Sequence, residues 1–222
     1  MIKMVVFDMA GTTVDEDNIV YKTLQTTISQ AGVNCSLEQV LRVGAGKEKL
    51  MAIRDILAEN GIEMHYSLAQ EIYKSFVAEL AVAYDVYPLK PQPGAAALFA
   101  ELRNKKIAVV LNTGYNATTA NFILQKLGWQ TGGVIDGLIT ASDVANSRPK
   151  PDMILLAMQQ FGITDAAEVA KVGDSAIDIL EGKNAGCGLT VGITTGAHTF
   201  KQLLEPDPDY IIHSLSDLLP LL

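Results

Sequence analysis

Short apolar runs and longer amphipathic stretches alternate along most of the chain. Residues 3–8 contain an uninterrupted apolar run that ends at Asp8. A run without polar alternation is typical of a strand that is buried on both faces of a parallel sheet. Similar strand candidates follow at 107–111, 134–139, 169–172, 189–193 and 210–212.

Stretches with helical spacing lie between these apolar runs. They are predicted at 94–104, 117–128, 151–162, 176–185 and 198–204. Regular alternation of strands and helices predicts an α/β fold with a doubly wound parallel sheet, that is, a Rossmann-like core.

Residues 17–88 break this alternation, because they show helical spacing without a strong strand run. Tyr21, Leu24 and Ile28 are one example of that spacing. A linker rich in proline follows, with Gly94 at its end. We therefore predict a core formed by residues 1–16 and 89–222, with a small helical cap domain at 17–88 inserted after the first strand.

Composition and charge limit the possible functions. The chain has 222 residues, of which 49% are hydrophobic and 19% are charged, as in an ordinary soluble globular protein. A net charge of -8 makes nucleic-acid binding a poor candidate, since that function needs clustered lysine and arginine. No apolar run approaches the roughly 18 residues of a membrane helix. We see no signal peptide, and we expect a cytoplasmic protein with Cys35 and Cys187 as small, buried, reduced residues.

Carboxylates stand at the ends of two predicted strands. Asp8 follows the first strand, Asp174 follows the strand at 169–172, and Asp178 comes one helical turn later. Ligands of open parallel sheets bind beyond the carboxyl ends of the strands. Three carboxylates near one point can hold a hard cation, for which Mg²⁺ is the natural choice, although each residue alone also fits a helix cap.

Two further polar residues have positions suited to a phosphoryl group. Thr113 follows a predicted strand, where a hydroxyl and backbone N–H groups can bind a phosphate oxygen or simply cap a helix. Arg148 lies in a loop stiffened by Pro149 and Pro151. A fixed cation there would pair with the nucleophile and the transferring group, although many loop cations are only solvated.

The order of these residues resembles the four motifs of the haloacid dehalogenase superfamily, and the resemblance covers nearly the whole chain. It implies that Asp8 attacks phosphorus and forms an aspartyl-phosphate, with Thr113 and Arg148 as further catalytic residues. The implied phosphoryl-binding residues are Ala10, Gly11, Thr12, Thr113 and Gly114. The implied metal site, for Mg²⁺, consists of Asp8, Ala10, Asp174 and Asp178.

Two departures from the superfamily pattern are informative. Most members carry an aspartate at position 10, where it protonates the leaving oxygen, whereas this chain has Ala10. Most members also carry lysine where this chain has Arg148 (Lys150 is the other candidate for that position). Both departures resemble the phosphonoacetaldehyde hydrolase branch, whose opening Asp-x-Ala-Gly-Thr-Thr-Val-Asp fits residues 8–15.

A carbon leaving group needs an electron sink, and that branch supplies one through a cap lysine that forms a Schiff base. Lys47, in the glycine-rich segment 43–49, aligns best with this lysine, and Lys49 is the second candidate. Either residue alone also fits a solvated lysine at the start of a helix. The chain departs from the branch at Val43, where the branch has methionine, and at Leu50, where it has histidine.

The chain has three histidines, His65, His198 and His213, and they lie elsewhere in the sequence. We interpret them as surface or helix-end residues rather than as catalytic groups.

These observations predict a Mg²⁺-dependent hydrolase that cleaves phosphorus from a small phosphonate such as phosphonoacetaldehyde. The alternative is a phosphate-monoester phosphatase of phosphoglycolate type, for which Lys47 would be dispensable and the proton would come from the cap. A non-catalytic anion-binding module is a third possibility, disfavoured by the intact aspartates. We expect a small phosphonate or phosphate as the partner, no nucleic acid or membrane, and a monomer or homodimer.

Overall fold

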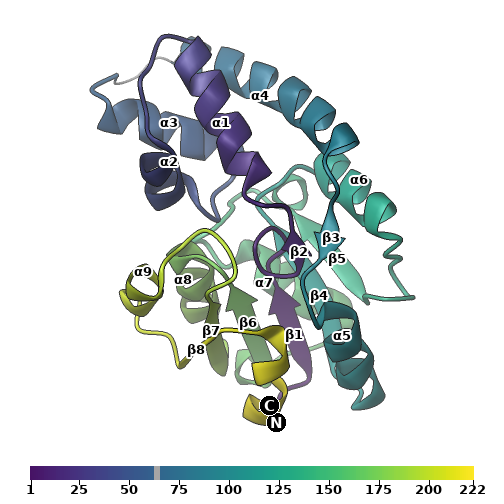
Figure 1. Cartoon of the computed structure of the whole chain (residues 1–222). Helices are drawn as coiled ribbons and strands as arrows, with labels where there is room; N and C mark the ends of the chain where they lie inside the picture. Colours follow the sequence, from purple (N-terminus) through teal and green to yellow (C-terminus); the bar gives the residue numbers. More distant parts are fainter. Residues whose placement is uncertain (63–65) are drawn as a thin grey trace.

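A six-stranded parallel sheet forms the centre of the chain in a computed structural model, which describes residues 1–62 and 66–222 (Figure 1). The strand order is β5-β4-β1-β6-β7-β8, and every neighbouring pair is parallel. The strands are β1 (Met4–Phe7), β4 (Ala108–Thr113), β5 (Gly137–Thr140), β6 (Val169–Gly173), β7 (Leu189–Ile193) and β8 (Tyr210–Ile212). The predicted doubly wound α/β fold is confirmed.

The winding direction of the sheet reverses at β1. From β1 the chain adds β4 and β5 on one side, and it then returns to add β6, β7 and β8 on the other. Ligands of such sheets bind beyond the carboxyl ends of the strands, where the strand order reverses. The residues that follow β1, β4 and β6 therefore converge on one region.

Both faces of the sheet are covered, so its side chains are buried on either side. The flanking helices are α5 (Ala95–Asn104), α6 (Ala117–Leu127), α7 (Asp152–Phe161), α8 (Ala176–Ala185) and α9 (Phe200–Leu204). On β1, Val5 and Phe7 join the larger buried cluster, whereas Met4 and Val6 join the smaller one. Because successive strand residues point to opposite faces, β1 needs an apolar residue at every position.

Four helices follow β1 in the sequence and interrupt the sheet connection. They are α1 (Ile19–Gln30), α2 (Leu37–Gly44), α3 (Lys49–Glu59) and α4 (Tyr66–Val86). They pack on one another beyond the carboxyl end of the sheet (Figure 1). The chain enters and leaves this helical segment through an antiparallel ribbon of β2 (Val14–Asp15) and β3 (Lys90–Pro91). The division into a core and a cap domain stays a prediction.

Two elements begin two or more residues later than the sequence pattern predicted. Strand β5 begins at Gly137 because a turn precedes it, in which the Gly132 N–H donates to the Ile135 carbonyl. Helix α9 begins at Phe200 because Thr199 is its N-cap residue. Apolar residues in a turn or before a cap resemble those of the element itself, so periodicity alone placed the boundaries too early.

The two cysteines are half-buried rather than fully buried, and both are free thiols. Burial raises the pKa of the Cys187 thiol to about 12. Within residues 1–62 and 66–222, none of the helices is both long and apolar enough to cross a membrane.

Tilted and edge-to-face aromatic contacts hold α5 against the sheet. The Phe99 ring lies 5.4 Å from that of Phe7 and 5.3 Å from that of Trp129, between ring centroids. We expect Phe99→Ala to lower the free energy of unfolding by about 3–5 kcal/mol, because the lost ring leaves a cavity. Phe200→Ala, which removes a 50% exposed ring, serves as the control and should change it by less than about 0.5 kcal/mol. Equal losses of unfolding free energy in the two variants, measured by urea denaturation, would contradict the prediction.

Candidate active site

Asp8 occupies the carboxyl end of β1 and is only 5% exposed. Its N–H donates to the Val172 carbonyl of β6 at 2.9 Å, and its carbonyl accepts a hydrogen bond from Thr13 Oγ1 at 2.9 Å. Both bonds hold the backbone, so the Asp8 carboxylate projects from a rigid support. Burial raises the pKa of this carboxyl, and the charge of Arg148 opposes that rise.

The turn after β1 brings its backbone close to Asp174. Gly11 has a left-handed φ of 81°, and a Cβ at this position would collide with the Asp174 carboxylate. Thr12 Oγ1 donates to Asp174 Oδ1 at 3.5 Å. Ala10 is buried and carries only a methyl group, so its side chain can neither donate a proton nor bind a metal.

Arg148 is a fully buried cation in contact with Asp8. Its Nη1 lies 2.7 Å from Asp8 Oδ1 and 3.0 Å from Asp178 Oδ1. Its Nε donates to Glu181 Oε2 at 3.0 Å, and Nη2 donates to both oxygens of Asn112 at 2.7 and 2.6 Å. Burial alone would lower the pKa of Arg148, but the neighbouring carboxylates outweigh it and raise the pKa. The guanidinium is therefore charged and held rigidly.

Asp8, Asp174 and Asp178 form a compact acidic group. One carboxylate oxygen from each lies within 4.8 Å of the others. Burial, together with the charges of Asp8 and Asp178, raises the pKa of Asp174 well above its usual range. Burial would also raise the pKa of Asp178, but the charges of Arg148 and Lys171 outweigh it and lower that pKa.

This donor set suits a hard divalent cation. Asp178 Oδ1 is buried and accepts no hydrogen bond from the described residues, although the nitrogens of Arg148 and Lys171 lie 3.0 and 2.9 Å away. Carboxylate oxygens are the ligands that Mg²⁺ prefers. When all four carboxyl groups are ionised, the three aspartates and Glu181 carry four negative charges, and Arg148 and Lys171 carry two positive charges. One divalent ion would balance the remaining two negative charges.

Three further buried residues complete the cluster, and they were not among the site residues predicted from the sequence. Lys171 Nζ donates to Asn112 Oδ1 at 2.6 Å and lies 3.2 Å from Glu181 Oε2. Asn112 Nδ2 donates to both Glu181 oxygens at 2.9 Å. Glu181 follows Asp178 by three positions in α8, and that helical spacing was an available signal. Lys171 and Asn112 lie within strands, where no comparable spacing pointed to them.

The loop between α2 and α3 rests on the carboxyl end of β4. Thr113 ends this strand, is buried, and accepts the Tyr115 N–H at its Oγ1, 3.2 Å away. A Cβ on Gly114 would lie 2.6 Å from the Lys47 carbonyl oxygen, so only glycine allows this approach. The Gly46 carbonyl accepts a hydrogen bond from the Arg148 Nη1 at 3.3 Å. The helical segment therefore contacts the site directly.

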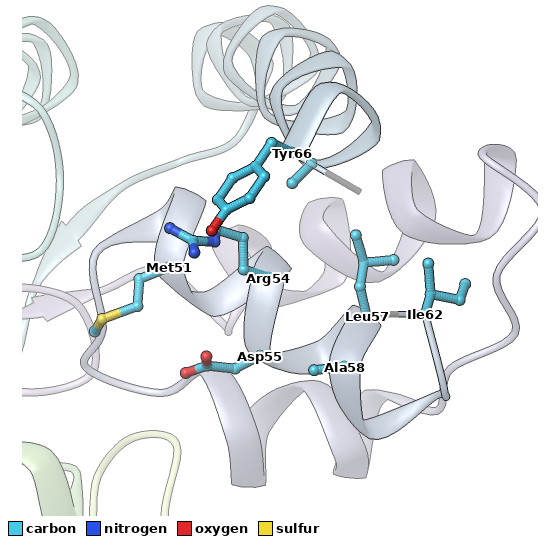
Figure 2. A pocket seen from close by; sticks show the side chains of 8 residues that line it. Met51, Arg54, Asp55, Leu57, Ala58, Ile62 and Tyr66 are labelled. Carbon is cyan, nitrogen blue, oxygen red and sulfur yellow. The ribbon is translucent and has the colours of Figure 1, made fainter. Parts of the chain in front are cut away.

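Lys47 lies in this loop and Lys49 is the first residue of α3, but their amines occupy different environments. The Lys47 amine pairs with Asp55 Oδ2 at 2.6 Å. Asp55 lines a cavity of about 350 Å³ within the helical segment, beside Met51 and Arg54 (Figure 2). The amine predicted as the Schiff-base group is therefore engaged by a carboxylate of the helical segment.

Lys49 is the more deeply buried of the two, at 6% exposure. Its Nζ donates to the Lys47 carbonyl at 2.8 Å and lies 5.4 and 5.3 Å from the ring centroids of Tyr21 and Tyr115. Burial lowers the pKa of this amine, and the charge of Asp8 opposes the change. A lowered pKa increases the fraction of neutral amine, the form that attacks a carbonyl carbon.

A buried carboxyl group adjoins the same tyrosines. Glu16 follows β2, is 2% exposed, and accepts a hydrogen bond from the Tyr84 hydroxyl at Oε2. The Tyr84 and Tyr115 hydroxyl oxygens lie 2.6 Å apart. Burial raises the pKa of Glu16 to about 8, although the Tyr84 hydrogen bond lowers it. Glu16 was not among the site residues predicted from the sequence.

His198 is buried rather than at the surface, and it lies at a helix end, since it precedes the N-cap residue of α9. Its Nδ1 accepts the Ala176 N–H at 3.0 Å, and its Nε2 lies 3.2 Å from the Leu41 carbonyl oxygen. It thereby connects α8 with α2. His213 is exposed, as interpreted, and His65 lies outside the described residues.

Comparison with known proteins identifies related sequences. A family model described as haloacid dehalogenase-like hydrolase matches residues 2–186. The chain is 30% identical to the phosphonoacetaldehyde hydrolase of Lactiplantibacillus plantarum over 220 residues, covering 89% of this chain and 77% of the relative. It is 29% identical to the probable phosphatase IndB of Dickeya dadantii over 219 residues, covering 97% and 91% of the two chains.

A solved structure supports the fold. The phosphonoacetaldehyde hydrolase-like protein of Oleispira antarctica superposes with a TM-score of 0.86 at 22% identity, covering 99% of this chain and 91% of the other. The resemblance inferred from the sequence motifs is confirmed by these matches.

Removal of one buried cation tests the charge balance of the cluster. We expect Lys171→Met to lower the free energy of unfolding by about 3–5 kcal/mol, because Asp178 and Glu181 lose a buried partner. The control is Lys183→Met, which removes an exposed amine 3.4 Å from Asp207 and should have little effect. Chemical denaturation in metal-free buffer measures both, and a Lys171→Met protein as stable as wild type would refute the argument.

Proposed function

The chain belongs to the haloacid dehalogenase-like hydrolase family, and on that premise we propose that it hydrolyses a small phosphonate such as phosphonoacetaldehyde. One observation carries the proposal: position 10 has no acid, while the buried amine of Lys49 lies beside Tyr115 near the carboxyl end of β4. An oxygen leaving group needs a proton, whereas a carbon leaving group needs an electron sink. An amine that forms an iminium with the substrate aldehyde supplies that sink.

Asp8 is the nucleophile in this proposal. A carboxylate oxygen attacks phosphorus while the carbon–phosphorus bond breaks, and the bonding electrons move to the iminium and leave an enamine. Arg148, 2.7 Å from Asp8 Oδ1, orients the carboxylate and offsets the charge of the transferring group. Thr113, Gly114 and the turn at residues 10–12 are proposed to bind the phosphoryl oxygens.

Asp8, Asp174 and Asp178 are the proposed Mg²⁺ ligands. The bound ion would screen the negative charge of the phosphoryl oxygens from the attacking carboxylate. Since Ala10 has no side-chain donor, its predicted part in metal binding is limited to its carbonyl oxygen.

We assign the electron sink to Lys49 rather than Lys47. The resemblance alone favours Lys47, but its amine pairs with Asp55 at 2.6 Å. Lys49 is desolvated and near enough to Asp8 for that charge to oppose the fall in its pKa. Residues 17–88, which supply both lysines, are proposed as a cap domain joined to the core through the β2–β3 ribbon.

A phosphate-monoester phosphatase is the second candidate. The relative from Dickeya dadantii is named a probable phosphatase, and it aligns with 97% of this chain. Under this alternative, a group other than Ala10 would protonate the leaving oxygen, and neither Lys47 nor Lys49 would form a covalent adduct.

Asp8→Asn tests the nucleophile. We expect kcat for phosphate release to fall on the order of 10⁴-fold or more with any phosphonate or phosphate substrate, because an amide cannot form the acyl phosphate. Asp207→Asn is a matched control, since its carboxylate is 96% exposed and its backbone φ of 56° suits asparagine. Substantial turnover by the Asp8 variant would exclude the assignment.

Reductive trapping identifies the electron sink. Incubation with phosphonoacetaldehyde, Mg²⁺ and borohydride should give a covalent adduct, which peptide mapping should locate on Lys49 because its amine is desolvated. Phosphate release is measured in parallel without borohydride. An adduct on Lys47 would support the choice from the sequence instead. Phosphate release from phosphoglycolate without any adduct would favour the phosphatase.

A further inference from the structure

We propose that Glu16 is the general acid–base residue for iminium formation at Lys49, acting through a tyrosine-lined interior. This inference rests on the proposed function and adds a proton donor that Ala10 cannot provide. It is carried by the burial of Glu16, by one carboxyl oxygen that lacks a partner among the described residues, and by hydrogen bonds that link Glu16 through Tyr84 to Tyr115, whose ring faces the Lys49 amine.

Tyrosine hydroxyls connect the Glu16 carboxyl with the surroundings of Lys49. Tyr84 donates its only hydroxyl hydrogen to Glu16 Oε2, so the Tyr115 hydroxyl, 2.6 Å from that of Tyr84, must be the donor between the two. The ring of Tyr115 then packs against the Lys49 amine, with 5.3 Å between the nitrogen and the ring centroid. Glu16, from the segment after β2, and Lys49, from α3, therefore adjoin one aromatic cluster.

The two oxygens of Glu16 have different roles. Oε2 accepts the Tyr84 hydroxyl and also the Val20 N–H at 3.2 Å. Oε1 is buried and has no hydrogen-bond partner among the described residues. A carboxyl that served only to cap the start of α1 would not need a second, unpartnered buried oxygen. Oε1 is therefore the position left for the proton of the neutral acid, since Oε2 already accepts two hydrogen bonds.

Opposite pKa shifts are consistent with this geometry. Burial raises the pKa of Glu16 to about 8, and burial lowers the pKa of Lys49. The Tyr84 hydroxyl and the charge of Lys49 lower the pKa of Glu16, whereas the charge of Asp8 raises it further. The charges of Asp8, Glu48 and Glu16 raise the pKa of Lys49, whereas that of Arg148 lowers it further. Both shifts increase the fraction of the uncharged forms, a neutral acid and a neutral amine, which are the forms needed to begin imine formation.

The proposed step is balanced in atoms and charge. The neutral Lys49 amine adds to the aldehyde carbon, and transfer of its proton to the carbonyl oxygen gives a carbinolamine. Glu16 then donates its proton to the carbinolamine hydroxyl, which leaves as water, and the products are an iminium cation and the Glu16 carboxylate. The enamine left by carbon–phosphorus cleavage takes a proton at carbon from solvent to give the final iminium. Hydrolysis of that iminium reverses the step above and returns a proton to Glu16.

Glu16→Gln tests the proposal, because glutamine keeps the shape and one acceptor oxygen but carries no transferable proton. The probe is acetaldehyde with cyanoborohydride, because it has no phosphorus and reports only the formation of the iminium. The rate is measured as the adduct that peptide mapping finds on Lys49. We expect the trapping rate at pH 7 to fall on the order of 10²–10⁴-fold. Asp17→Asn, at the exposed carboxylate next in the chain with a φ of 48°, should trap at the wild-type rate.

The pH profile separates a catalytic role from a structural one. The acid is present below a pH of about 8 and is lost above it, so the rate advantage of wild type over Glu16→Gln should shrink as the pH rises through that value. Asp8, Lys49 and the tyrosines at positions 21, 84 and 115 also lie around Glu16 and can titrate. The quantity to compare is therefore the ratio of the wild-type trapping rate to the Glu16→Gln trapping rate at each pH. Tyr84→Phe removes a hydrogen bond that lowers the pKa of Glu16 and should move the inflection to higher pH.

The outcomes distinguish the two proposals. A Lys49 adduct that forms equally fast in wild type and in folded Glu16→Gln would overturn the role of Glu16 and leave the proposed function standing. A Tyr84→Phe profile identical to that of wild type would also count against Glu16. If peptide mapping finds no adduct on Lys49 in wild type, the assignment of Lys49 as the electron sink is overturned instead.

Discussion

The buried guanidinium of Arg148 is the contact on which the site depends. It ties together the carboxylate after β1, the asparagine of β4, two carboxylates of α8 and the loop between α2 and α3. Each of these charges would be costly to bury alone, whereas together they compensate one another. The geometry of the Asp8 carboxylate is thus set by the whole cluster, including the part of the chain that precedes α3.

Ala10 has consequences that extend beyond the turn in which it lies. Without an acid at this position, the core offers Asp8 and a set of cations but no side chain at position 10 that could protonate a leaving group. The interior formed by the helical segment holds the complementary groups, a desolvated amine at Lys49 and a carboxyl of raised pKa at Glu16. In our proposal, a residue at the edge of the sheet therefore attacks phosphorus, whereas a residue of the helical segment accepts the electrons of the leaving group.

The strand-end residues could be predicted because parallel strands meet at a common edge. Asp8, Thr113 and Asp174 each follow an apolar run, and knowledge of the sheet type was enough to expect them near one another. Lys171 and Asn112 could not be predicted in the same way. They lie within buried strands, and only the strand order brings them to Glu181 at 3.2 and 2.9 Å.

The sequence by itself determined the fold class, the order of the elements and the acidic group at the carboxyl edge, because periodicity and strand-end position are local properties of the chain. Only the tertiary structure shows how the environments of Lys47 and Lys49 differ, which is the basis of our assignment of the electron sink. The two residues are close neighbours in the chain, but one amine meets Asp55 and the other lies between Tyr21 and Tyr115. The pKa and reactivity of an amine depend on desolvation and nearby charge, and the residues that supply both come from distant parts of the sequence.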